Sequence, residues 1–111
     1  MQGQDRRAAI AAYKERKSRA GIYALRCPAA GTIWVGRTLT LETVENRHRF
    51  ALRMGNAPQA GLQAAWRQYG PDGLVFEVLE VLPEEELDFA RDALLKDRLA
   101  HWCAALQAQL L

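Results

Sequence analysis

Residues 21–36 read Gly-Ile-Tyr-Ala-Leu-Arg-Cys-Pro-Ala-Ala-Gly-Thr-Ile-Trp-Val-Gly. Both ends of this stretch are rich in aromatic and β-branched residues, which favour strands. The segment Pro28-Ala29-Ala30-Gly31 between them has the composition of a turn. The stretch therefore predicts a single β-hairpin, which brings Tyr23 in its first strand near Trp34 in its second.

The sequence on either side of this hairpin predicts helices and one more strand. Apolar residues recur at helical spacing, and Thr, Pro and Gly stand where helices begin or end. The expected elements are a basic amphipathic helix from Asp5 to about Ser18, hairpin strands over 21–26 and 32–36, a helix capped by Thr40 and ending at Met54, a helix from Pro58 to before Gly70, a strand over 74–81 and a helix from Pro83 to about Gln107.

The composition is that of an ordinary globular protein. The chain has 111 residues, 50% hydrophobic and 25% charged, which is enough for one core and one domain. No apolar run approaches the roughly 20 residues of a membrane span, and residues 1–7 lack the apolar region of a secretory signal, so a cytoplasmic protein is expected. Cys27 and Cys103 are isolated in sequence, which favours reduced packing residues over a zinc site or a disulfide.

Charge is divided unevenly along the chain. Residues 1–70 contain 12 Lys or Arg and 4 Asp or Glu, a net charge of +8, whereas residues 71–111 contain 3 and 9, a net charge of −6. The basic half could neutralise phosphates, or it could be a solvated surface without a partner. The candidate nucleic-acid contacts are Arg16, Lys17, Arg19, Arg37, Arg49 and Arg53.

Two tripeptides of the hairpin resemble the paired signature of the GIY-YIG nuclease family. They are Gly21-Ile22-Tyr23 and, after ten intervening residues, Trp34-Val35-Gly36, with tryptophan in place of the usual second tyrosine. Arg47 lies on the helix after the hairpin, where the family has an arginine directed at the scissile phosphate. The segment 62–80 also resembles family members in which a Leu-Gln-x-x-Trp helix precedes the third strand.

The resemblance implies an α+β fold with a small three-stranded antiparallel sheet flanked by helices. The GIY-YIG-like domain would cover residues 20–111, and residues 1–19 would add a basic N-terminal helix. The implied activity is that of a metal-dependent endonuclease acting on nucleic acid, with DNA as the expected substrate. Tyr23 would accept a proton from water, and Arg47 would stabilise negative charge on the phosphate.

The implied cofactor is one Mg²⁺ or Mn²⁺ ion held by a carboxylate on the helix after the third strand. The segment 93–99 resembles the apolar run that leads to this acid in the family, which nominates Asp97. Helix geometry gives independent support, because Ala90, Ala93, His101 and Ala104 fall within about 40° of Asp97. Its flank would thus be made largely of alanine, which could let the carboxylate sit close to a sheet. The reserve candidates are Glu77, Glu86 and Asp92.

Two departures from the family pattern bear on activity. Trp34 can donate one hydrogen bond but cannot transfer a proton in the role of the second tyrosine. Many members carry a histidine four residues after the arginine, and that position is Ala51 here. His48 lies on the same helix, either as a core residue or as a group that orients water or phosphate.

Three functions are therefore compared. The first is the endonuclease, and the second is a catalytically impaired nucleic-acid-binding module with the same fold. The third, a protein-interaction domain that uses the acidic final helix, has only composition in its favour. No membrane partner is expected, and the oligomeric state stays open.

Overall fold

The computed structural model of the protein describes residues 19–84 and 87–111. Its elements are β1 (Gly21–Cys27), β2 (Thr32–Thr38), α2 (Leu41–Arg53), α3 (Ala60–Tyr69), the short 3-10 helix η1 (Pro71–Gly73), β3 (Val75–Val81), α4 (Asp88–Leu106) and β4 (Gln109–Leu110). The helix expected from Asp5 to Ser18 lies outside the described residues, and so do Arg16, Lys17 and Glu86.

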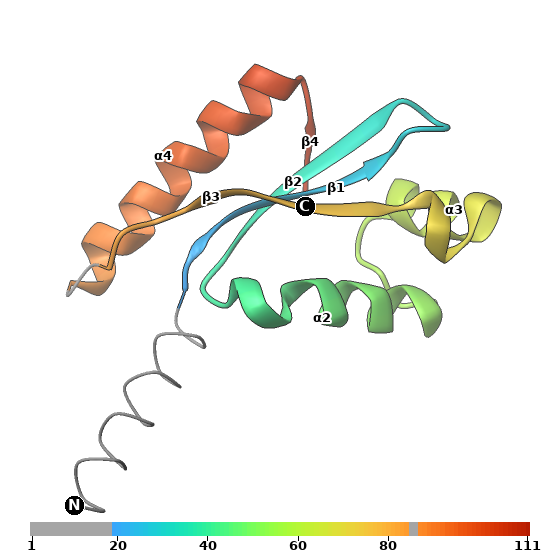
Figure 1. Cartoon of the computed structure of the whole chain (residues 1–111), viewed down its shortest axis with the longest axis horizontal. Coiled ribbons are helices and arrows are strands. Elements are labelled where there is room, and N and C mark those ends of the chain that lie inside the picture. The colour runs from blue at the N-terminus through green and yellow to red at the C-terminus, as the bar shows by residue number, and fades with distance from the viewer. Residues whose placement is uncertain (1–18, 85–86) are drawn as a thin grey trace, which may run out of the picture.

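The strands form one open sheet in the order β3-β1-β2-β4 (Figure 1). The central strand β1 pairs antiparallel with both β2 and β3, which confirms the predicted hairpin and three-stranded antiparallel sheet. The two-residue strand β4 was not predicted, and it pairs parallel to β2, so the complete sheet is mixed. The fold class is α+β, as expected.

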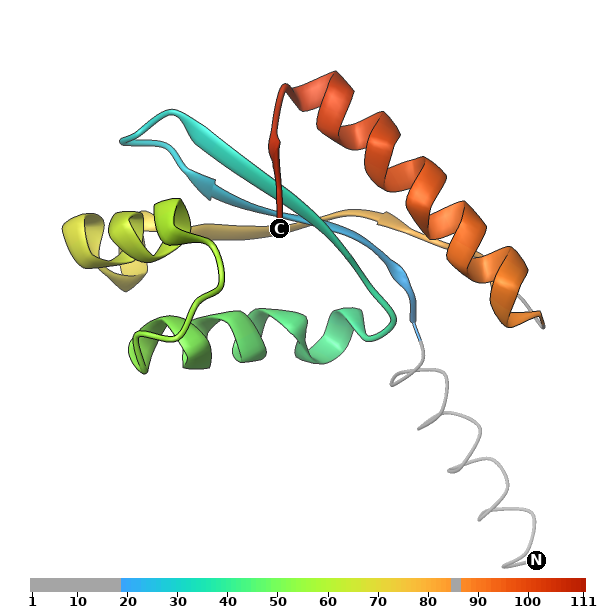
Figure 2. The ribbon, with the colours of Figure 1, turned by 180° about the vertical axis from the view of Figure 1, so that it is seen from behind.

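Helices cover both faces of the sheet. Figures 1 and 2 show α4 on one face and α2 with α3 on the other. Leu25 of β1 packs in a buried cluster with Leu52 of α2 and Leu62 of α3, whereas its neighbour Ala24 packs in a cluster with Leu95 of α4. Because both faces are covered, β1 is buried along nearly its whole length and lacks the polar alternation of a half-exposed strand.

Helices α2 and α3 follow the sequence prediction closely. Thr40 is the residue before α2, but its side chain makes no capping hydrogen bond to the helix. At the end of α2, Gly55 has a φ of 76°, a left-handed conformation that suits glycine and stops the helix. The third helix begins at Ala60, two residues after Pro58.

The final helix begins later than predicted, at Asp88 instead of Pro83. The backbone N–H of Leu82 still donates to the carbonyl oxygen of Ala20 at 2.9 Å, so the chain continues along the sheet beyond β3. Glu80 of β3 then holds α4 in place, because its Oε1 accepts hydrogen bonds of 2.8 Å from Arg98 Nε and Trp102 Nε1. In the described part of the chain, no helix has the length and apolar character needed to span a membrane.

Candidate functional site

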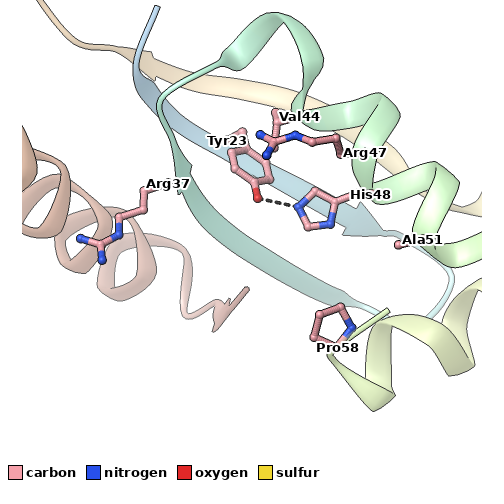
Figure 3. Close-up of a pocket in the computed structure, with 7 residues that line it drawn as sticks. All are labelled: Tyr23, Arg37, Val44, Arg47, His48, Ala51 and Pro58. Atoms are coloured by element: carbon pink, nitrogen blue, oxygen red, sulfur yellow. Dashed lines mark hydrogen bonds between the residues drawn. The ribbon is translucent and has the colours of Figure 1, made fainter. Parts of the chain in front are cut away.

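An open pocket of about 280 Å³ lies between β1, β2 and the inner face of α2 (Figure 3). Its walls include four residues that the sequence nominated as catalytic or nucleic-acid-binding, together with Val44 and Ala51 of α2 and Pro58. The lining residues are Tyr23, Arg37, Val44, Arg47, His48, Ala51 and Pro58.

Tyr23 reaches the pocket because the residue opposite it in the hairpin has no side chain. Tyr23 pairs with Gly36 across β1 and β2. A Cβ atom built on Gly36 would lie 2.7 Å from the Tyr23 hydroxyl oxygen, a separation that real Cβ atoms do not reach. The ring is further fixed by Phe76 of β3, which stacks on it with a centroid separation of 5.7 Å. The phenol is therefore held in one position and is only 3% exposed.

The hydroxyl of Tyr23 forms a hydrogen bond of 2.6 Å with Nε2 of His48. Val44, His48 and Ala51 lie on one face of α2, because they follow a spacing of four and three residues, and this face lines the pocket. The sequence left two interpretations of His48 open, a core residue or a site residue. In the structure its ring forms a hydrogen bond with the phenol of Tyr23, which the family resemblance nominated.

The surroundings keep both members of this pair uncharged at neutral pH. Burial raises the pKa of Tyr23 to about 12, although the nearby Arg47 charge opposes the rise. Burial, and then the Arg47 charge, lower the pKa of His48 below its usual 6.5. When the phenol is the donor, Nε2 is the free acceptor nitrogen and Nδ1 carries the imidazole hydrogen.

Arg47 is held beside this pair by two hydroxyl groups. Its Nη2 donates to Thr38 Oγ1 at 3.1 Å and to Thr40 Oγ1 at 3.0 Å. The backbone N–H of Thr40 also donates to Thr38 Oγ1 at 3.0 Å. The hydroxyl of Thr40 thus positions the arginine instead of capping the helix, and Arg47 presents a fixed cation at the mouth of the pocket.

A second pocket, of about 310 Å³, lies on the α4 side of β2 and contains a carboxylate. Arg37, Leu39, Asp92 and Leu95 line it. Arg37 lines both pockets, and Figure 3 shows its side chain directed away from Tyr23 and His48. Asp92 was a reserve candidate for the metal ligand. It lines this second pocket, and the described residues that line the first pocket include no aspartate or glutamate.

Asp97, the first choice from the sequence, lies elsewhere. It is exposed, it lines neither pocket, and it is about 140° around α4 from Asp92. Its neighbours Ala93 and Ala104 are also exposed, so the small-residue face that we expected to approach the sheet is turned to solvent. The leucine-rich face packs on the sheet instead, around Leu95.

One carboxylate beside an open pocket is compatible with a magnesium or manganese site, because Mg²⁺ is often held by one or two carboxylates together with substrate phosphates. Within residues 19–84 and 87–111 there is no group of three or more His, Cys, Asp or Glu side chains that could enclose an ion. Glu77, another reserve candidate, is engaged with Arg26 at 2.7 Å. An ion held by the single carboxylate of Asp92 would take its other ligands from water and from a bound phosphate.

The remaining predicted site residues have different surroundings. Trp34 is 3% exposed and packs in the core with Leu62 and Ala65 of α3, so it lines neither pocket. The guanidinium of Arg49 is occupied inside the fold, because it donates to Glu45 and to the carbonyl oxygens of Pro71 and Leu74. The exposed cations among the described candidates are Arg19, Arg37 and Arg53.

Sequence reasoning missed Thr38 and Thr40 as the residues that hold Arg47, and it gave no sign that Asp92, a reserve candidate, lines a pocket. The threonines gave no separate signal, because Thr40 also suited a helix cap. The position of Asp92 near the sheet could have been predicted from the apolar pattern of the final helix. Leu95 and Leu99 mark the face that packs on the sheet, and Asp92 is three residues, about one turn, before Leu95.

Comparison with solved structures identifies the fold. The catalytic domain of the homing endonuclease I-TevI is 22% identical, with a TM-score of 0.69, over 83% of this chain and 97% of that domain. A variant of the same catalytic domain, with a glutamate replaced by alanine, is 24% identical, with a TM-score of 0.68, over 80% and 84%. No protein-family model and no curated protein matches the chain. The likeness confirms the GIY-YIG nuclease fold that residues 21–36 indicated.

Proposed function

We propose that this protein is a nuclease that hydrolyses nucleic-acid phosphodiester bonds, with DNA as its substrate, at the pocket formed by Tyr23, Arg47 and His48. The observation that carries the proposal is the 2.6 Å contact between the Tyr23 hydroxyl and His48 Nε2 beside a fixed arginine. The fold of an endonuclease catalytic domain supports the same reaction class.

The chemistry follows from the protonation states of these groups. A phenol with a pKa of about 12 is not ionised near neutrality, so Tyr23 alone is a poor base. His48 corrects this, because its neutral Nε2 can take the phenolic proton while the phenolic oxygen takes a proton from the attacking water. Tyr23 then stays neutral throughout, and His48 becomes the imidazolium.

Arg47 supplies the second requirement, which is stabilisation of negative charge on the phosphate. Its Nη2 is fixed by Thr38 and Thr40, so the guanidinium needs little reorganisation when the substrate binds. A planar guanidinium can also donate two parallel hydrogen bonds to phosphate oxygens. Arg47 would thus orient the phosphate against the Tyr23 hydroxyl.

Asp92 is the residue that we assign to hold the divalent ion. The ion would supply positive charge near the leaving oxygen. The Asp92 carboxylate lies on the other side of β2 from the phenol, in a pocket that Arg37 also lines. Asp97, which the sequence nominated, is the competing assignment.

The test uses labelled single-stranded and double-stranded DNA with Mg²⁺, with Mn²⁺ and with a chelator. We expect cutting with either ion and none with the chelator. Asp92→Asn should lose cutting and should also weaken Mn²⁺ binding measured by titration calorimetry, because the amide is isosteric but uncharged. Asp97→Asn is the matched control, since it removes an exposed aspartate from the same helix.

Two results would change the proposal in different ways. If Asp97→Asn stops cutting while Asp92→Asn does not, the assignment from the sequence is right and the one from the geometry is wrong, but the protein remains a nuclease. If the unaltered protein binds the labelled DNA but cuts neither the strand nor the duplex with either ion, it is a nucleic-acid-binding module.

A further inference from the structure

The outer face of α2, next to the pocket, carries two large apolar side chains in water. Phe50 and Met54 are each 60% exposed. Phe50 follows Arg47 by three residues and Met54 follows Phe50 by four, so the three side chains share one face of the helix. Ala51, which follows Phe50 in sequence, lines the pocket itself. Arg47, which shares the face of Phe50, also lines the pocket, so this apolar pair begins one turn of the helix away from a residue of the candidate site.

The chain segment that carries this surface is rich in positive charge. From Asn46 to Pro71 the chain has no aspartate or glutamate and has four arginines. Arg53 is exposed at the end of α2. The guanidinium of Arg67 also reaches this end, since a Cβ atom built on Gly55 would lie 3.8 Å from its Nη2. An apolar pair among cations complements a polyanion that also has flat apolar faces.

We propose that Phe50 stacks on an unpaired nucleobase next to the phosphate bound by Arg47, so that the substrate is single-stranded or locally unpaired nucleic acid. This inference rests on the proposed function, because it needs a nucleic acid in the pocket. Surfaces that bind single strands combine cations that follow the phosphates with aromatic rings that stack on bases. A base inside a duplex already stacks on both neighbours and leaves no face for Phe50.

The geometry suits one nucleotide contacting both residues. Cβ atoms three residues apart on a helix are separated by about 5–6 Å. A phosphate at Arg47 and the adjoining base at Phe50 could therefore be held together. Met54 would extend the apolar contact, because its flexible thioether adapts to irregular surfaces.

The experiment measures binding by fluorescence anisotropy in a chelator, so that no cutting occurs. The probes are one labelled DNA strand and its duplex, and the variants are Phe50→Ala, Phe50→Leu and Phe50→Trp. We expect Phe50→Ala to weaken single-strand binding by about five-fold to one-hundred-fold, with little change for the duplex. Phe50→Trp should keep the affinity, whereas Phe50→Leu, which is apolar but has no ring, should behave like Phe50→Ala.

Salt dependence separates stacking from phosphate contacts. Phe50→Ala should lower the affinity without changing the slope of log Kd against log salt concentration, because no phosphate contact is removed. Val78→Ala is the control, since it truncates an apolar side chain, 43% exposed, on the edge strand β3. An oligonucleotide with 2-aminopurine adds a direct readout, because its fluorescence should fall on binding the unaltered protein and fall less with Phe50→Ala.

Unchanged single-strand affinity in Phe50→Ala would overturn the proposal. An equal loss for single strand and duplex would also overturn it, and so would a change in sedimentation with unchanged affinity, which would make Phe50 a self-association contact. The outcome is separable from the nuclease proposal. A protein that binds single strands through Phe50 but never cuts would remove only the nuclease function.

Discussion

At the scale of single residues, the pairing of Tyr23 with His48 is the main finding. The hydroxyl identified by the family resemblance is too weak an acid to ionise near neutral pH, and the structure supplies a neutral imidazole within hydrogen-bond distance. Burial is the main cause of both pKa shifts. Burial disfavours the phenolate and the imidazolium, and the Arg47 cation further disfavours the imidazolium.

This pair predicts the pH dependence of cutting. Protonated His48 cannot accept the phenolic proton, so the single-turnover rate should fall as the pH drops through the His48 pKa, which lies below 6.5. The rate should be level above that pH and should show no second rise near pH 10, because the pKa of Tyr23 is raised to about 12. The rate is measured between about pH 5 and pH 10. A rate that keeps rising tenfold per pH unit across this range would show that the phenolate is the base and that His48 is not the acceptor.

At the scale of elements, the hairpin of β1 and β2 depends on Gly36 to place the Tyr23 ring. Gly36 leaves the space that the Tyr23 ring occupies, and Leu111 packs against the buried cluster to which Tyr23 belongs. The sequence showed Gly36 as part of a motif, but its physical role became visible only with the strand register, which places it opposite Tyr23.

Gly36→Ala should therefore displace the phenol from His48. The added methyl group would lie 2.7 Å from the hydroxyl oxygen, so the ring or the strand has to move. We expect cutting to be lost and the free energy of unfolding to fall by about 1–3 kcal/mol, as in other overpacked sites. Urea unfolding and a cleavage assay measure the two effects.

Gly61→Ala is the matched control for this substitution. Its added methyl group would meet Trp34 at 3.8 Å, an ordinary contact, and Gly61 lies within α3. The variant should keep full cutting and should be as stable as the unaltered protein or more stable by about 0.5–1 kcal/mol. Full cutting by Gly36→Ala would show that the position of the phenol does not matter.

The elements also show how far the sequence could be interpreted. The periodic apolar residues of α2 predicted that helix well, because Leu41, Val44 and Leu52 are the ones that become buried. On α4 the sequence showed two faces, one of leucines and one of alanines, and we placed the alanines towards the sheet. Burying a leucine stabilises a protein by about 1.5–3 kcal/mol relative to exposure, far more than burying an alanine, so the leucine face packs inward.

Other features were not predictable from local patterns. The strand β4 has two residues, which is too short to give an alternating pattern, and it forms because the end of the chain returns to β2. The link between Arg47 and its two threonines depends on how the loop between β2 and α2 folds. Long, periodic segments were thus predictable, whereas contacts made by loops and chain ends were not.

For the whole molecule, the uneven charge suggests a basic surface on the N-terminal half that binds phosphates. Arg53 is exposed on this half, whereas Arg49 is occupied by Glu45 and by the loop around η1. The two arginines lie on the same helix and belong to the same set of candidates from the sequence. The structure gives them different expected roles.

Binding measured over a range of salt concentrations should distinguish these roles. For duplex DNA, log Kd should rise with log salt with a slope of about 0.9 per phosphate contact, and Arg53→Ala should reduce the slope by about one contact. Arg49→Ala should leave the slope unchanged but lower the free energy of unfolding by about 1–3 kcal/mol, because two backbone carbonyls lose a charged donor. The reverse pattern would place Arg49 on the nucleic acid.

The central claim is that the Tyr23 hydroxyl, paired with His48, takes the proton from water during phosphodiester hydrolysis. The most direct test is the single-turnover cleavage rate of Tyr23→Phe with saturating DNA and Mg²⁺, with DNA affinity and urea unfolding measured alongside. We predict that affinity and fold are kept and that the rate falls by at least about one-hundred-fold, because only the hydroxyl is removed. A variant that cuts at the rate of the unaltered protein would contradict the claim.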